Sequence, residues 1–216
     1  MHARVLTLGR RLLDVLVPGS CAACAEPLGS FGLFCPRCAR EAQLKLHQGS
    51  LDGVPTVSLG PYAGPLKDAI RRFKYDKRAE LAEPLARALL AHTQAEVAFG
   101  GRDLVPVPLH PMRLAERGFN QSALLAKGLA RPASAVYCPR ALLRRSNTAR
   151  QARLERSARE ENLREQIQAR HPPSGRPVVL VDDVLTTGST ARACLSALRS
   201  VNARVELIVV LARAGV

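Results

Sequence analysis

Tryptophan is missing from this sequence, and aromatic residues make up only 4% of the 216 residues. Proteins that bind single-stranded nucleic acid by stacking its bases rely on aromatic side chains. Any nucleic-acid contact should therefore go to the phosphate backbone and weaken steeply with salt. Acidic residues are also few, since 18 Asp and Glu face 32 Lys and Arg, for a net charge of +14. This charge is compatible with an anionic partner such as nucleic acid, a site for phosphate groups, or an arginine-favouring genome.

Long apolar runs are absent too. No stretch reaches the roughly 18 apolar residues that indicate a membrane-spanning helix. The segment Val5–Val17 does not have the pattern of a signal peptide, because Arg10, Arg11 and Asp14 interrupt it. It instead predicts a short amphipathic helix, packed on its own domain or lying on a membrane surface. Without export we expect a cytoplasmic protein with reduced cysteines.

Cysteine is scarce, but four of the six cysteines form two C-x-x-C pairs. Cys21 and Cys24 make the first pair, Cys35 and Cys38 the second, and ten residues separate the pairs. Four thiolates at this spacing complete a tetrahedral Zn²⁺ site with no open position, which indicates a structural metal. The segment has few large apolar residues, so metal binding would supply the stability that burial cannot. Cys194 belongs to the apolar stripe of a later helix and is expected in the core.

The most informative stretch is Pro177–Arg192, with the sequence PVVLVDDVLTTGSTAR. Its apolar run predicts a strand buried on both faces, and the apolar spacing that follows predicts a helix from near Ser189. A second apolar run, Val205–Leu211, completes a parallel strand–loop–helix–strand unit. The intervening loop lies at the carboxyl end of a buried strand, where open α/β sheets bind ligands.

This loop combines groups that suit a phosphate with groups that suit a sugar diol. Helix N–H groups and hydroxyls can bind a phosphate monoester, and a glycine lets the backbone approach it closely. The residues with these roles are Thr186, Thr187, Gly188, Ser189 and Thr190. Asp182 and Asp183 can accept from a ribose diol or hold Mg²⁺. The pattern predicts a site for a ribose 5-phosphate; the alternative is a plain strand–turn–helix with two solvated aspartates.

A second candidate site follows the apolar run Asp103–Leu109. Pro106 and Pro108 lack N–H groups on the same side of this strand, which places them at its exit or facing a sheet edge. The next residues, HPMRLAERGFNQ, bring Arg113, Arg117 and a glycine to the strand exit. Guanidinium groups there could grip a pyrophosphate.

Between the cysteines and this strand the sequence predicts a linker, a strand and two helices. Gly49–Pro55 concentrates glycine and proline and predicts the linker, and Val57–Tyr62 predicts a short strand. The apolar faces of the helices are Leu66, Ile70 and Phe73, then Leu81, Leu85 and Leu89. The basic residues of the first helix are either solvated or face an anion.

The acidic strand and its loop resemble the PRPP-binding motif of type I phosphoribosyltransferases. Together with LLDVLVPGSCAAC, YAGPLKDAIRRFKY and VPVPLHPMRLAERGFNQ, they resemble the ComF family of competence-associated proteins, which includes GntX-type proteins. The resemblance runs from about Leu12 to Arg213. It implies a zinc-binding segment joined to a phosphoribosyltransferase-like domain and a role in the uptake of transforming DNA. Arg140–Arg170 resembles a family segment in which a mobile loop closes over the sugar.

We therefore expect a helix and zinc-ribbon-like module over residues 1–48 and a phosphoribosyltransferase-like α/β domain over 54–216. Its mainly parallel sheet should have about five strands. The favoured function is PRPP or ribose 5-phosphate binding, with Mg²⁺, in a DNA-uptake factor that contacts single-stranded DNA or the uptake machinery. The alternative is an active transferase, with Asp182 and Asp183 as catalytic residues, that releases pyrophosphate from PRPP. A sensor that binds PRPP without turnover is a third possibility. No stretch indicates a nucleobase pocket.

Overall fold

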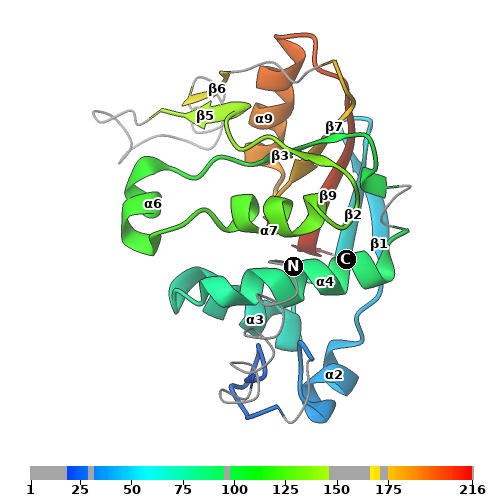
Figure 1. The fold of residues 1–216 in the computed structure, drawn as a ribbon, viewed down its shortest axis with the longest axis vertical. Coiled ribbons are helices and arrows are strands. Elements are labelled where there is room, and N and C mark those ends of the chain that lie inside the picture. Colours follow the sequence, from blue (N-terminus) through cyan, green and yellow to red (C-terminus); the bar gives the residue numbers. More distant parts are fainter. Residues whose placement is uncertain (1–18, 29–31, 95–97, 146–165, 171–174, 216) are drawn as a thin grey trace, which may run out of the picture.

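The computed structural model describes residues 19–28, 32–94, 98–145, 166–170 and 175–215. The amino-terminal helix expected over Val5–Val17 lies outside these residues, as does most of the arginine-rich segment Arg140–Arg170. Figure 1 shows a sheet with helices on both faces and the four-cysteine segment at one end, beyond α3. Among the described helices, none is both long and apolar enough to cross a bilayer.

The main sheet is mostly parallel, with strands in the order β1-β2-β9-β7-β3-β4 and β8 paired beside β9. Only the β1–β2 pair is antiparallel in this sheet. The strands are β1 His47–Leu51, β2 Val54–Pro61, β3 Asp103–Pro106, β4 Val136–Tyr137, β7 Val178–Val181, β8 Val184–Leu185 and β9 Val205–Arg213. A second, antiparallel sheet pairs β5 Leu142–Arg144 with β6 Ile167–Ala169. The α/β class and the parallel sheet are confirmed. The expected strand count was too low, because β1 was assigned to a linker and the two-residue strands β4 and β8 are too short to give a pattern.

The linker expected over Gly49–Pro55 is wrong. His47–Leu51 forms strand β1, and Leu51 pairs with Val54 across a two-residue turn. The turn residues Asp52 and Gly53 both have positive φ, 50° and 79°. An Asp-Gly turn of this kind matches the twist of the strands beside it, so the glycine that suggested a linker instead closes a hairpin.

The described helices are α2 Pro36–Ala42, α3 Gly64–Tyr75, α4 Ala82–His92, α6 Pro111–Arg117, α7 Gln121–Ala130 and α9 Ser189–Arg199, with a 3₁₀ turn at Ala79–Leu81. Four of them lie on the two faces of the sheet. Residues of α3, α4 and α7 form one core with Val179 and Val181 of β7 on one face. Helix α9 packs on the other face, against Val178 and Leu180. Alternate residues of β7 thus enter two different cores, which explains its uninterrupted apolar run.

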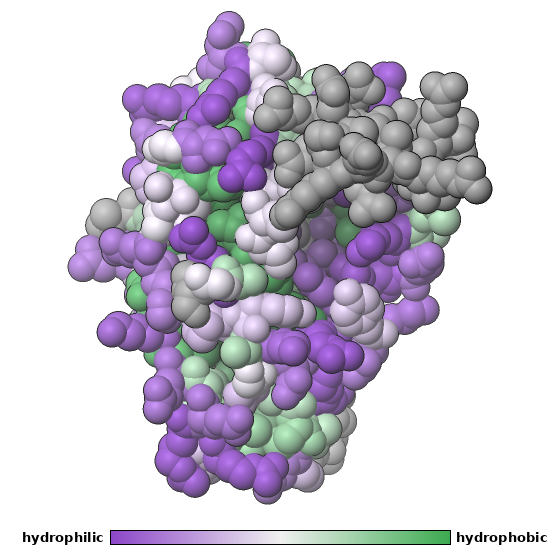
Figure 2. All heavy atoms as spheres, turned by 180° about the vertical axis from the view of Figure 1, so that it is seen from behind, coloured by the Kyte–Doolittle hydropathy of each residue, from purple (hydrophilic) through white to green (hydrophobic). Residues whose placement is uncertain are grey.

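The side away from the view of Figure 1 combines polar and apolar residues. Figure 2 shows hydrophilic side chains mainly around the rim of this face, with hydrophobic and intermediate residues through its centre and a pale-green hydrophobic group at its lower end. Cys194 is fully buried in the α9 core, as expected. The predicted helix start near Ser189 is confirmed as well.

Candidate functional site

The two aspartates lie at the carboxyl end of β7, held in place by the neighbouring strand β9. The backbone N–H of Asp182 donates to Val209 O at 3.0 Å, and the carbonyl oxygen of Asp183 accepts from Leu211 and Ala212 at 3.0 and 3.2 Å. These backbone bonds fix where the two carboxylates emerge from the sheet. The acidic pair therefore has a rigid base at the sheet edge where ligands bind in open α/β folds.

Asp182 accepts two hydrogen bonds on the same oxygen. Ser122 Oγ donates to Asp182 Oδ1 at 2.8 Å, and the backbone N–H of Asp183 donates to it at 2.9 Å. Burial, together with the adjacent charge of Asp183, raises the pKa of Asp182 to about 7. Near neutral pH this carboxyl group can accordingly hold a proton or release it, depending on what binds beside it.

Asp183 is paired with a lysine from a distant helix. Lys74 Nζ of α3 lies 2.8 Å from Asp183 Oδ1, and the two side chains are only 16% and 5% exposed. The other carboxylate oxygen, Asp183 Oδ2, is buried and has no hydrogen-bond partner within the described parts of the chain. An orphaned carboxylate oxygen is the kind of atom that binds a hard cation or a sugar hydroxyl.

The loop after β8 is shaped by Gly188, the residue before α9. Its φ of 80° lies in the left-handed region, and a Cβ at this position would come within 2.8 Å of Leu51 Cδ1. Only glycine meets both conditions without strain. Thr187 Oγ1 lies 2.9 Å from Ser189 Oγ, and the Thr186 and Thr187 side chains face solvent. The loop thus presents hydroxyls at the start of an eleven-residue helix.

The β1–β2 hairpin braces this loop. Arg192 Nη1 donates to the carbonyl oxygen of Thr187 at 2.9 Å, while its Nε donates to Asp52 Oδ1 at 3.1 Å. Arg199 adds a hydrogen bond to Asp52 O at 3.3 Å. Sequence reasoning missed this support because it assigned the hairpin to a linker. The Asp-Gly dipeptide was the signal that could have revealed it.

The two arginines expected near a pyrophosphate have different surroundings. Arg117 is buried, donates to Gln121 Oε1 and lies over the Tyr75 ring, 5.5 Å from its centroid. Arg113 is exposed on α6. Burial, then the charges of Arg144 and Arg113, lower the pKa of His110. Arg113 therefore belongs to a positively charged group at the end of β3, whereas Arg117 is held by protein contacts.

Two functional candidates went unrecognised in the sequence, Lys74 and Ser122. Lys74 was only one of several basic residues on its helix. Ser122 depends on Asn120, whose Oδ1 accepts from the backbone N–H of Ser122 at 3.0 Å and whose Nδ2 donates to Val107 O at 3.0 Å. Asn120 thereby caps α7 and aims Ser122 at Asp182. The Asn-Gln-Ser run before an apolar stripe was a readable capping signal.

The four cysteines come together as expected. The sulfurs of Cys21, Cys24, Cys35 and Cys38 all lie within 4.8 Å of one another. Cys24 Sγ and Cys35 Sγ are 3.8 Å apart, which equals the edge of a tetrahedron with metal–sulfur bonds of about 2.3 Å. Burial raises the pKa of the Cys21 thiol, but hydrogen bonds led by the backbone N–H groups of Cys24 and Cys35 outweigh it and bring the pKa to about 7. The cluster fits a tetrahedral thiolate-bound metal.

The chain is similar to a known protein-family domain and to several known proteins. The family model of the phosphoribosyl transferase domain matches residues 116–215. A DNA utilization protein YhgH of Escherichia coli is 34% identical over 200 residues, which cover 81% of this chain and 88% of that protein. Competence protein F of Haemophilus influenzae is 32% identical over 215 residues, covering 94% and 93%. Adenine phosphoribosyltransferase from Saccharomyces cerevisiae matches at 18% identity and a TM-score of 0.41, over 82% of this chain and 90% of that one.

The domain match and the parallel sheet define the class: a phosphoribosyltransferase-type α/β domain that carries a four-cysteine module on its amino-terminal side. Within that class the relatives are more specific, because their similarity extends over most of both chains. The chain belongs to the ComF family. The resemblance seen in its motifs is thereby confirmed.

Proposed function

We propose that this chain binds PRPP, or a related ribose 5-phosphate, with Mg²⁺ at the carboxyl edge of β7. The observation that carries the proposal is the orphaned, buried oxygen of Asp183 beside a hydroxyl-rich loop at a helix start. The loop Thr186–Thr190 would take the 5-phosphate through N–H and hydroxyl donors. Asp182 and Asp183 would take the ribose diol and the cation.

Lys74 makes the acidic pair compatible with an anionic ligand. Its ion pair with Asp183 balances one negative charge, and the raised pKa of Asp182 limits the other. Arg113 would add positive charge on the pyrophosphate side. Arg117, which Gln121 and Tyr75 already hold, would act there only by changing partners. Mg²⁺, when bound, supplies charge neutralisation for the pyrophosphate.

The metal of the cysteine module is proposed to be Zn²⁺ in a structural role. Support comes from the chemistry of the donors, since four thiolates are the preferred ligand set of structural zinc. The sulfur separation also fits. With all four positions filled by protein, such a site has no room for a reacting group.

At the level of the cell, we propose that the protein takes part in handling DNA during uptake or use. The names of its relatives support this, one being a DNA utilization protein and another a competence protein. The net charge of +14 favours contact with a polyanion. With few aromatic residues, binding of single-stranded DNA would rest on the phosphates, so affinity should fall by orders of magnitude between about 50 and 200 mM salt.

The alternative is catalytic turnover. A nitrogen nucleophile would attack the anomeric carbon of PRPP as the bond to pyrophosphate breaks, and the fixed ribose and the neutralised leaving group would lower the barrier. The loop and the acidic pair serve binding and catalysis equally, so turnover needs its own measurement. Pyrophosphate release from PRPP, assayed with a panel of nucleobases and with single-stranded DNA, decides between them.

Isothermal titration calorimetry of PRPP with Mg²⁺ tests the binding proposal. We expect binding to the wild type and a loss of at least roughly tenfold in affinity, about 1.4 kcal/mol, in the double variant Asp182→Asn, Asp183→Asn. Asp68→Asn, an exposed aspartate on α3, is the matched control and should bind as the wild type does. Equal affinity in the double variant would remove the assignment.

A further inference from the structure

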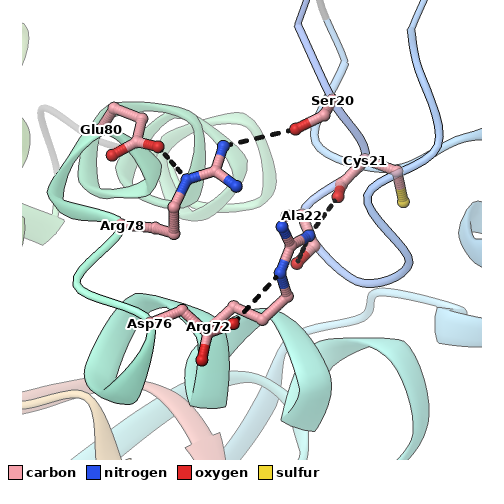
Figure 3. A network of polar contacts seen from close by, with 7 residues as sticks. All are labelled: Ser20, Cys21, Ala22, Arg72, Asp76, Arg78 and Glu80. Carbon is pink, nitrogen blue, oxygen red and sulfur yellow. Dashed lines mark hydrogen bonds and ion pairs between the residues drawn. The ribbon is translucent and has the colours of Figure 1, made fainter.

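Helix α3 touches the cysteine module through one arginine. Arg72 Nη1 donates to the backbone carbonyl oxygens of Cys21 and Ala22, at 2.8 and 3.3 Å. Its Nε lies 3.6 Å from Asp76 Oδ2, one turn further along the helix. Figure 3 shows the guanidinium group between the helix and the first cysteine knuckle, which is the C-x-x-C turn that begins at Cys21. The knuckle backbone is therefore a hydrogen-bond acceptor for α3.

A second arginine repeats this link just beyond the helix. Arg78 Nη2 donates to Ser20 Oγ at 3.3 Å, and the same guanidinium is ion-paired with Glu80 (Figure 3). The residue before the first cysteine is thus bound as well. The two arginines thus bind the first knuckle and the residue that precedes it. Their contacts depend on that backbone keeping the shape that the four sulfurs impose on it.

The same helix also delivers Lys74 to the acidic pair. Arg72 and Lys74 are two positions apart, which corresponds to about 200° around an α-helix. One side chain consequently faces the cysteine module while the other faces the sheet, where Lys74 Nζ meets Asp183 at 2.8 Å. A buried ion pair tolerates little displacement, because separating the charges leaves one of them desolvated and unpaired.

We propose that the cysteine module positions Lys74 at the acidic site, with Arg72 as the residue that transmits the state of the module through α3. Metal-loaded cysteines hold the knuckle carbonyls where Arg72 can bind both, and α3 then keeps Lys74 on Asp183. Loss of the metal, or oxidation of the thiols, would release Arg72 and loosen the ion pair. The module would in this way control the charge of the site as well as stabilise the fold. The consequence for ligand affinity rests on the proposed function; the mechanical link does not.

Chemical labelling of lysines measures the link without any ligand. The full-length, Zn²⁺-loaded protein is acetylated briefly, and the rate at each lysine is read by mass spectrometry. We expect Lys74 to react roughly tenfold faster in Arg72→Met, the fold-change for about 1.4 kcal/mol of lost protection. Chelation of the zinc should have a similar effect. The exposed Lys127, on α7, corrects for differences in reagent dose, and circular dichroism reports on general unfolding.

Arg71→Met is the matched control. Arg71 is the neighbouring arginine of the same helix and is exposed, lining a hollow of about 300 Å³ beside the module. Its variant should leave the Lys74 rate unchanged. If circular dichroism shows that Arg72→Met is unfolded, Arg72→Lys replaces it, since that variant keeps a cation in the helix. An unchanged Lys74 rate in a folded Arg72 variant would overturn the proposal, as would an equal rise in Arg71→Met.

Calorimetry then separates this link from the proposed function. If the wild type binds PRPP with Mg²⁺, Arg72→Met should weaken binding while Arg71→Met should not. Lys74→Arg should retain more affinity than Lys74→Met, because the arginine still supplies a cation to Asp183. If the wild type binds no PRPP, the proposed function fails, and the labelling result alone still decides whether the module positions Lys74.

Discussion

Replacing Asp182 with asparagine removes the carboxylate whose ionisation the fold opposes. Burial and the charge of Asp183 raise the pKa of Asp182 from 3.8 to about 7. Asparagine keeps nearly the same shape and can still accept the hydrogen bond from Ser122, but it cannot ionise. The variant therefore isolates the free energy that is linked to this one proton.

The sign of the effect follows from which state holds that proton more tightly. Between pH 3.8 and about 7 the folded chain keeps the Asp182 proton while the unfolded chain has lost it. The wild type accordingly loses stability as the pH rises through this window. At about 1.4 kcal/mol per pKa unit the whole window corresponds to at most about 4 kcal/mol, and the part above pH 5 to about 2–3 kcal/mol.

Urea unfolding followed by circular dichroism, from about pH 5 to pH 8 with zinc and without Mg²⁺, measures this difference. The unfolding free energy of Asp182→Asn minus that of the wild type should grow by about 2–3 kcal/mol across the range. Titration of the cysteines is common to both proteins and cancels. Asp68→Asn, an exposed aspartate, should give a flat difference. A flat difference for Asp182→Asn itself would refute the reasoning.

Other consequences can be measured on single variants. Gly188→Ala should cost about 1–3 kcal/mol of unfolding free energy, because φ is 80° and the new Cβ meets Leu51. Measured in a Leu51→Ala background, the same substitution should lose only the steric part of this cost, and a cost of zero there would show that φ is not strained. Cys35→Ser should release the metal, measured with a colorimetric chelator, whereas Cys138→Ser, outside the cluster, should retain it. Arg192→Met should loosen the hydroxyl loop, seen as faster hydrogen exchange over Thr187–Thr190, while exchange in β9 stays slow.

The sequence predicts best where the structural signal is local. Strand β7 is predictable from its sequence, because its alternate residues enter two different cores and every position is therefore apolar. The start of α9 and the cysteine cluster are equally local, since each depends on a spacing of a few residues. All of these features are present in the structure as the sequence indicated.

Two parts of the site depend on contacts that no local pattern encodes. Strand β1 is HQGSL, an exposed and polar edge strand whose only apolar anchor, Leu51, packs near Gly188. Lys74 and Asp183 are neighbours only because α3 packs on the sheet that contains β7 and β9. In such cases the turn or helix is predictable, while its partner is set by the tertiary fold.

An acidic pair repels a phosphate ligand, and two contacts of the site reduce that repulsion. Lys74 balances the charge of Asp183, and the raised pKa of Asp182, about 7, favours the neutral form of that carboxyl group. Without a ligand the site therefore carries little net negative charge. A cation that binds Asp183 Oδ2 would lower the pKa of Asp182 and let Lys74 turn towards an anion. If the site binds as proposed, its charge would thus follow its occupancy, which a pair of solvated aspartates could not achieve.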